Sequence, residues 1–205
     1  MSDLSDFSVD ELAAEVRRRV REDEKLRSFW PDEVYGLMTE ISVIPCVDCL
    51  LVRQDQGKFP ELGFSIRNTG FYAGKKWMAA GGRINRGESL SGALKRHVKT
   101  DLGLEIRLAP GLEWNVPILV SQHGPEVFDL DAGEYAGDER SKFCVSATYL
   151  VVAVGENVVL GEKAGGQESA GLVWYAANAL PPDEDIAYGG QTTIRRLAAW
   201  AIANL

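Results

Sequence analysis

The chain has 205 residues, of which 45% are hydrophobic and 25% are charged, and its formal net charge is -8. This length and apolar fraction allow one sizeable hydrophobic core plus a helical extension. An acidic surface repels a phosphate backbone, and no apolar run reaches the length of a membrane span, so we expect neither nucleic-acid binding nor a membrane protein. Three cysteines, an odd and low number, argue against a disulfide scaffold and favour a cytoplasmic protein.

The first forty residues are predicted to form a helical extension. Residues 9–27 have apolar positions at helical spacing, and Ser8 with Glu11 forms a possible capping box at their start. The arginines of this helix are followed at once by acidic residues, which favours a solvated helix face over an anion-binding one. A second short helix is expected to begin at Pro31.

From residue 41 the pattern changes to short β-forming runs interrupted by two helices. Strands are expected at 43–54, 64–68, 75–80, 113–121, 143–154 and 171–175, and helices at 89–101 and 189–205. This order predicts an α+β fold for residues 41–205, an α/β/α sandwich with helices on both faces of a mixed sheet. The polar stretch 122–142 is long for a connection without structure, and such loops are usually functional or disordered.

Two cysteines in the first strand, Cys46 and Cys49, have the spacing of a zinc or redox pair. No second pair accompanies them, and they lie in an apolar, strand-like segment. We therefore interpret them as small core residues.

The most informative segment is a loop–helix–loop between Gly81 and Leu104. Gly81 and Gly82 follow a strand, where the lack of a side chain lets the backbone approach a ligand closely. Glu88 or Ser89 can cap the helix that follows, and Gly103 is placed to end it. The helix is therefore framed by glycines on both sides.

Within this helix, His97 and Asp101 are four residues apart and share one face. An imidazole and a carboxylate at the rim of a buried face can serve as metal ligands or as an acid/base pair. The pair can equally be a hydrogen bond that only satisfies buried polarity. The spacing leaves both interpretations open.

The spacing of six residues resembles the Nudix box, the motif of the Nudix hydrolase superfamily. The matching residues are Gly82, Glu88, Arg96, Val98, Gly103 and Leu104. The resemblance implies a Nudix fold and a nucleoside diphosphate derivative as substrate. The three glutamates that hold divalent ions in typical members are replaced by His97, Thr100 and Asp101, and only Asp101 keeps a carboxylate. Loss of two carboxylates of three weakens or abolishes a multi-metal site.

A branch with similar depletion, the GDP-mannose mannosyl hydrolases, resembles this sequence in further positions. The branch keeps the last helix carboxylate, here Asp101, and a Gly-Gly-Arg sequence that ends in Arg83. Arg67 matches an upstream arginine if a one-residue gap is allowed, and Gln122-His123 matches a Gln-His pair. The resemblance implies that Arg67, Arg83, Gln122 and His123 contact substrate. It also implies that water attacks the sugar carbon while the arginines neutralise the departing diphosphate.

The general base of that branch has no direct counterpart. Ser169 stands where its histidine is expected, and serine is no base near neutral pH, so Glu168 is the candidate replacement. The resemblance thus implies Asp101, Glu168, His123 and Arg83 as catalytic residues. It implies Mg²⁺ or Mn²⁺ as cofactor, with Asp101, Gly82, Glu88, Glu168 and His97 as candidate ligands.

For individual residues the sequence leaves a second interpretation open. Arg83 is either a phosphate clamp or one half of a surface salt bridge. Glu88 and Arg96 are expected to pair with each other and fix the loop to the helix. Trp77, Trp114 and Trp174 are expected in the core or as walls of the site.

The sequence therefore predicts a Mg-dependent hydrolase of a nucleoside diphosphate sugar, similar to GDP-mannose. The alternatives are a conventional nucleotide pyrophosphohydrolase and a Nudix-fold domain that binds or senses nucleotides with impaired catalysis. The N-terminal helices and the apolar C-terminal helix could support a homodimer.

Overall fold

The computed structural model describes residues 42–54, 59–68, 72–123, 143–154, 169–187 and 190–205, with single positions among residues 8–22. Glu168, most of the 122–142 loop and the expected helix at Pro31 lie outside the described residues. None of the helices in the described part is both long and apolar enough to cross a membrane.

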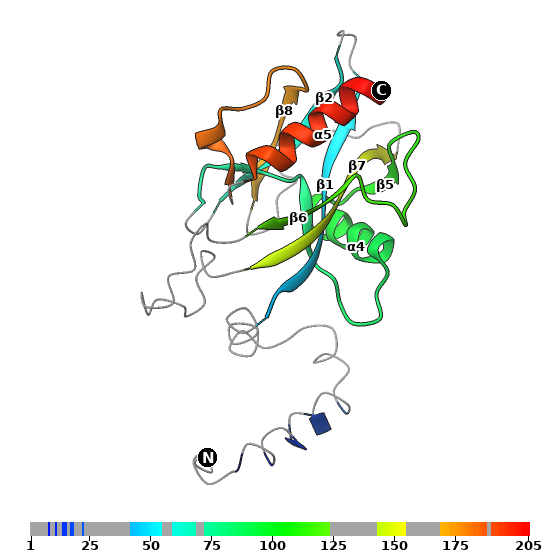
Figure 1. Cartoon of the computed structure of the whole chain (residues 1–205), viewed down its shortest axis with the longest axis vertical. Coiled ribbons are helices and arrows are strands. Elements are labelled where there is room, and N and C mark those ends of the chain that lie inside the picture. The colour runs from blue at the N-terminus through cyan, green and yellow to red at the C-terminus, as the bar shows by residue number, and fades with distance from the viewer. Residues whose placement is uncertain are drawn as a thin grey trace.

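One mixed sheet forms the centre of the fold (Figure 1). Its strands are β1 (Ile44–Arg53), β2 (Glu61–Arg67), β3 (Lys76–Trp77), β4 (Ala80–Arg83), β5 (Glu105–Leu108), β6 (Leu119–His123), β7 (Cys144–Val154) and β8 (Ser169–Ala176). β1 and β7 pair in parallel, while the other pairings are antiparallel. The helices are α4 (Leu90–Leu102) and α5 (Gln191–Asn204), with a short 3-10 turn, η3, at Asp183–Asp185.

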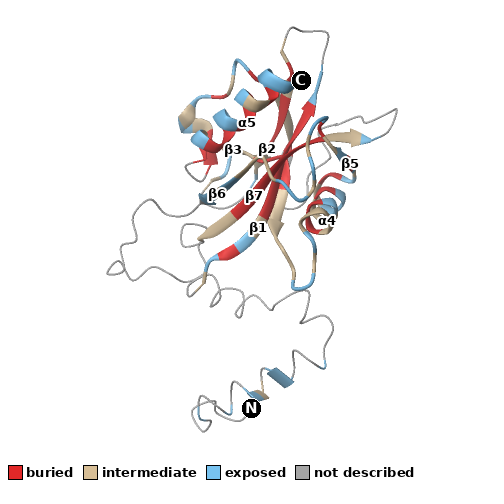
Figure 2. Ribbon diagram, turned by 45° about the vertical axis from the view of Figure 1, so that its right-hand side comes forward, coloured by how far each residue is buried: buried red, intermediate tan, exposed pale blue. Residues whose placement is uncertain are grey.

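β1 is buried on both faces because each face meets a different helix (Figure 2). Successive strand residues point to opposite sides. Val47, Cys49 and Leu51 therefore join a core that includes Leu94 and Val98 of α4. Leu50 and Val52 join a second core that includes Ile194 and Leu197 of α5. The result is the α/β/α sandwich that the sequence predicts.

The ends of α4 are set by the residues expected from sequence. Ser89 is the N-cap, and its side chain accepts a hydrogen bond from the Gly92 amide. Gly103 ends the helix with φ 69°, a left-handed conformation that costs glycine little. The prediction of a helix at 89–101 is confirmed within one residue at each end.

Several strand predictions need correction. The strand expected at 64–68 begins earlier, at Glu61, and the strand expected at 75–80 is divided into β3 and β4. The expected strand at 113–121 begins only at Leu119, because Glu113 and Val116 close a tight turn before it. β5 was not predicted, because its four residues alternate between exposed and inward positions and are too few for a clear pattern. β5 forms by pairing with the end of β7.

At the N-terminus, the capping box is present. The Ser8 amide donates to Glu11 at 2.8 Å, and the Glu11 amide donates to the Ser8 hydroxyl at 3.3 Å. Arg18 pairs with Glu15 and Glu22 on the exposed surface. Its charge is thus balanced within the helix.

The cysteine pair is split by the strand. Cys46 and Cys49 are three residues apart, so their side chains leave β1 on opposite faces and cannot bind one ion together. Cys49 is fully buried, Cys46 and Cys144 are half-buried, and none of the three forms a disulfide.

The start of α5 depends on close contact with Trp77. A Cβ at Gly190 would lie 2.1 Å from a carbon of the Trp77 ring, and its backbone amide donates to the Ala187 carbonyl. We expect Gly190→Ala to lower the free energy of unfolding by about 1–3 kcal/mol, because the ring or the helix must shift. Urea denaturation measures the change. Thr192→Ala, at an exposed position of the same helix, is the control and should cost much less.

Candidate functional site

The topology gathers most of the candidate residues at one end of the sheet. Arg83 pairs with Cys46 near the start of β1, and Arg67 is the last residue of the antiparallel strand β2. His123 pairs with Cys144 at the start of β7, which runs parallel to β1. β8 begins opposite Arg67, where Ser169 pairs with Arg67. Residues far apart in sequence thus share one edge of the fold.

The loop between β4 and α4 is tied to the helix by an ion pair. Arg96 donates from Nε and Nη2 to the two carboxylate oxygens of Glu88, each at 2.8 Å. Glu88 also accepts from the Asn85 amide at 3.0 Å, and Arg96 also donates to the Arg83 carbonyl at 3.0 Å. This geometry matches the pairing expected for Glu88 and Arg96. Bonding to Arg96 lowers the pKa of Glu88.

His97 lies against the glycine turn. Its Nε2 is 3.0 Å from the Arg83 carbonyl, and a Cβ at Gly82 would come within 2.7 Å of its ring. Gly82 also has φ 148°, a backbone conformation that L residues rarely adopt. Glycine is therefore required both by the backbone conformation and by the space that the His97 ring occupies. Burial lowers the pKa of His97, with the Arg83 carbonyl acting in the opposite direction. The ring is therefore neutral near pH 7 and donates from Nε2.

The side chain of Arg83 points away from α4, the helix that carries Asp101. Gly82 faces α4, so strand alternation turns the Arg83 side chain to the opposite face of the sheet, beside Cys46. Asp101 lies one turn beyond His97 on α4 and is partly buried. Its charge raises the pKa values of His97 and Arg96, although it is not their main influence. The contact between the end of β4 and α4 (the β4–α4 junction) therefore involves the backbone carbonyl of Arg83, whereas the Arg83 guanidinium points to the opposite face of the sheet.

The residues that the structure describes do not by themselves fit a Mg²⁺ site. No group of three or more histidine, cysteine or acidic side chains among them is placed to hold a metal ion. Both Glu88 oxygens accept hydrogen bonds, and His97 donates to a carbonyl. Magnesium prefers several oxygen ligands in an octahedral arrangement.

A buried acid behind the glycine turn was missed by sequence reasoning. Asp48 lies opposite Gly81 in the sheet and is 7% exposed. It accepts a hydrogen bond from the hydroxyl of Ser146, which is fully buried. A Cβ at Gly81 would lie 2.0 Å from an Asp48 oxygen, so only glycine fits there. The available signal was one carboxylate within an apolar strand.

Burial raises the pKa of Asp48 to about 6, and the bond from Ser146 only partly opposes this. Asp48 therefore packs against the glycine turn from the face of the sheet opposite α4, and burial disfavours its ionised form.

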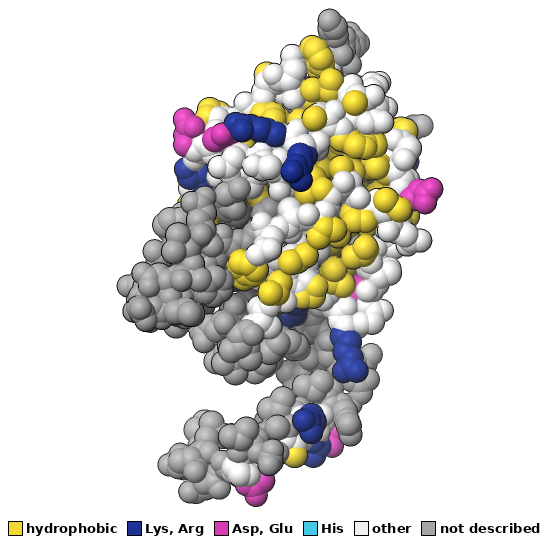
Figure 3. Space-filling model, viewed as in Figure 1, with side chains coloured by type: hydrophobic (Ala, Val, Ile, Leu, Met, Phe, Trp, Pro, Cys, Tyr) yellow, Lys and Arg dark blue, Asp and Glu magenta, His cyan; other side chains and the backbone are white. Residues whose placement is uncertain are grey.

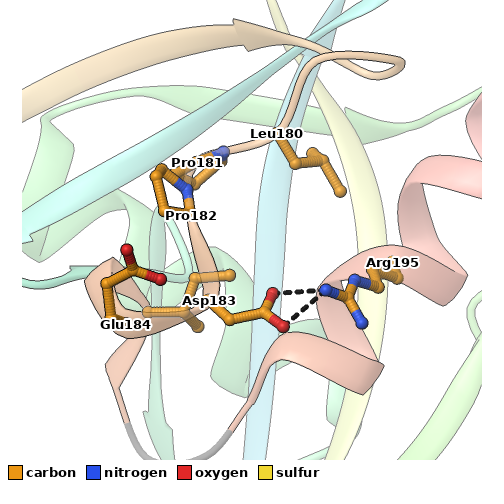
Figure 4. A pocket seen from close by; sticks show the side chains of 7 residues that line it. Leu180, Pro181, Pro182, Asp183, Glu184 and Arg195 are labelled. Atoms are coloured by element: carbon orange, nitrogen blue, oxygen red, sulfur yellow. Dashed lines mark hydrogen bonds and ion pairs between the residues drawn. The ribbon is translucent and has the colours of Figure 1, made fainter.

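A hollow of about 350 Å³ lies away from this turn, beside the first half of α5 (Figure 4). The one basic side chain among its described lining residues is already paired, because Arg195 donates to both carboxylate oxygens of Asp183, one at 2.6 Å. On the face drawn in Figure 3, the described basic side chains are scattered and do not form a patch. Neither the hollow nor these scattered basic side chains are therefore a better candidate for an anion site than the β4–α4 junction.

We expect Arg96→Met to lower the free energy of unfolding by about 1–2 kcal/mol, because three hydrogen bonds are lost and Glu88 keeps only the Asn85 amide. The stabilisation from Glu88 is present above its unfolded-state pKa and is lost as pH falls through its lower folded-state pKa. Urea denaturation at pH 7 and at pH 3.5 measures both effects. Lys99→Met is the matched control, since the Lys99–Glu105 pair is more than half exposed, and it should cost less than about 0.5 kcal/mol.

Asp48→Asn should make the protein more stable at pH 7.5, by at most roughly 3 kcal/mol, and should change little near pH 4. The folded-state pKa of about 6 lies above the ordinary value of 3.8. The charge penalty therefore grows as pH rises through this window and is complete above it. Comparing the variant with wild type by urea denaturation at both pH values tests this. An equal change at both, or a pH dependence matched by Glu113→Gln at an exposed site, would contradict it.

Comparison with known proteins gives one consistent result. No protein-family model and no curated protein matches the sequence. Among solved structures, a possible asymmetric diadenosine tetraphosphate hydrolase from Jonesia denitrificans aligns with a TM-score of 0.55 and 20% identity, covering 80% of this chain and 99% of that one. A MutT/Nudix family protein from Enterococcus faecalis aligns with a TM-score of 0.53 and 14% identity, covering 93% and 68%. A Nudix family hydrolase from Clostridium perfringens aligns with a TM-score of 0.50 and 18% identity, covering 80% and 99%. This chain therefore has the fold of the Nudix hydrolases.

Proposed function

We propose that this protein is a Nudix-type domain that binds a nucleoside diphosphate derivative, such as a nucleotide sugar, at residues 81–104. The observation that carries the proposal is the bidentate Glu88–Arg96 pair, which holds the Nudix-box loop on its helix between Gly82 and Gly103. Two structural parts of the motif, the loop clamp and the glycine frame, are retained. A retained scaffold with altered metal positions favours ligand binding over efficient hydrolysis.

The local charge supports an anionic ligand. Between Gly81 and Glu105 the chain has five basic and three acidic side chains, whereas the whole chain has a net charge of -8. A cationic segment in an acidic protein attracts small phosphates without offering a broad surface to nucleic acid. The Jonesia denitrificans structure described above is of a possible hydrolase of a dinucleoside polyphosphate, a ligand of the same chemical class.

Hydrolysis of the same ligand is the second candidate, and the retained carboxylate of Asp101 favours it. In this version Asp101 holds Mg²⁺ or Mn²⁺ with help from Glu168, and Arg67, Arg83, Gln122 and His123 contact the substrate. Attack at the sugar carbon gives free sugar and a nucleoside diphosphate. Attack at phosphorus gives a sugar phosphate and a nucleoside monophosphate.

A ligand panel tests the binding proposal. GDP-mannose, UDP-glucose and diadenosine tetraphosphate are each added at about 1 mM, in excess over the protein, and the melting temperature is measured. We expect at least one to raise it by several degrees, since a ligand that binds only the folded state stabilises it. Arg86→Ala combined with Lys95→Ala should remove most of the rise, because both side chains are exposed cations of this segment. Arg107→Ala, at an exposed arginine on β5, should not. A melting temperature unchanged by every ligand contradicts the proposal.

The same mixtures, with Mg²⁺ or Mn²⁺ added, decide between binding and hydrolysis. Mass spectrometry identifies the products, and the binding-only version predicts unchanged ligand. Conversion that disappears in Asp101→Ala would establish the hydrolase instead. The products then show which bond is attacked.

A further inference from the structure

The carbonyl of Arg83 is held by two donors from α4. Arg96 Nη2 and His97 Nε2 each lie 3.0 Å from this oxygen. A carbonyl oxygen has two lone pairs, so both of its acceptor positions are used by the protein. The end of β4 is therefore fastened to the helix by direct hydrogen bonds.

The carboxylate nearest to this junction is also occupied. Glu88 accepts two bonds from Arg96 and one from the Asn85 amide. Its negative charge is offset by the Arg96 guanidinium in direct contact. Both Glu88 oxygens are therefore engaged by hydrogen bonds, and Asp101 is the remaining carboxylate that α4 brings near this junction.

His97 adds no negative charge to the junction. Its ring lies beneath Gly82, and its Nε2 is 3.0 Å from the Arg83 carbonyl, an acceptor to which this nitrogen can only donate. The imidazole therefore connects the helix to the turn by a direct hydrogen bond. The loop–helix junction is thus complete without an ion.

Resting on the proposed function, we propose that this segment binds its diphosphate ligand through protein cations alone, without a resident divalent ion. His97 is the positioning residue that holds the turn in its binding shape. The exposed Arg86 in the loop and the exposed Lys95 on α4 are the cations of this segment that we expect to offset the diphosphate charge. Lys95 also lies 5.3 Å from the centre of the Trp114 ring, which orients its ammonium group.

A metal titration of the full chain gives a readout that does not depend on activity. Mn²⁺ is added to the protein in the absence of ligand, and free Mn²⁺ is followed by electron paramagnetic resonance. We expect no site with a Kd below about 1 mM, because isolated surface carboxylates hold Mn²⁺ weakly. A stoichiometric site of micromolar Kd that is lost in Asp101→Asn would overturn the proposal, and the full chain includes Glu168 in this test.

The effect of metal on ligand affinity is a second test of metal-free binding. The probe is the panel member with the largest shift in melting temperature, and its Kd is measured by calorimetry in EDTA and in Mg²⁺. We expect the two values to agree within about threefold. A loss of tenfold or more in EDTA overturns metal-free binding but leaves the proposed function standing. Absence of binding in both buffers rejects the proposed function itself.

Two substitutions test the role of His97. His97→Leu keeps the buried volume but cannot donate to the Arg83 carbonyl, whereas His97→Gln can. We expect His97→Leu to weaken probe binding at least tenfold and to speed amide hydrogen exchange at residues 83–88, and His97→Gln to stay within threefold of wild type. Thr100→Ala, at an exposed position of α4, is the control. Equal losses in the Leu and Gln variants at equal melting temperature would refute a positioning role.

Discussion

The parallel pairing of β1 with β7 is the constraint on which the rest of the structure depends. It places eight consecutive residue pairs in register, from Ile44 with Cys144 to Leu51 with Val151. Because both strands are covered on both faces, their alternating side chains form two separate cores. One core holds α4 and the other holds α5. Every part of the candidate site takes its place from this pair, since β4 pairs with β1 and β6 pairs with β7.

The glycine turn shows how closely the site is packed against that frame. Gly81 leaves room for Asp48 on one face of the sheet, and Gly82 leaves room for His97 on the other. Neither contact tolerates a Cβ, so the two glycines let buried polar groups support the turn from both sides. The Glu88–Arg96 pair then fixes the loop that follows. A loop supported in this way loses little entropy when it meets a ligand.

His97 stands where the Nudix box that this segment resembles has a glutamate, and this difference changes the local chemistry. An imidazole in place of a carboxylate exchanges a cation ligand for a hydrogen-bond donor, here the half-buried His97. The donor satisfies the Arg83 carbonyl directly, and the local balance of charge shifts toward positive. A diphosphate and a divalent cation make opposite demands on the charge of such a site. The retained scaffold and the altered charges are therefore consistent with one another.

The sequence by itself determined the helix ends at Ser89 and Gly103, the pairing of Glu88 with Arg96 and the α/β/α layering. Each of these depends on local spacing, capping or periodicity. Only the tertiary structure decided that His97 bonds to the Arg83 carbonyl, that Arg83 turns its side chain away from α4, and that Asp48 lies beneath Gly81. These contacts join different elements through strand register, and register is a property of paired strands that no single segment encodes. The short strand β5 has too few residues to show a pattern of its own, and it forms only by pairing with β7, 43 to 49 residues further along the chain.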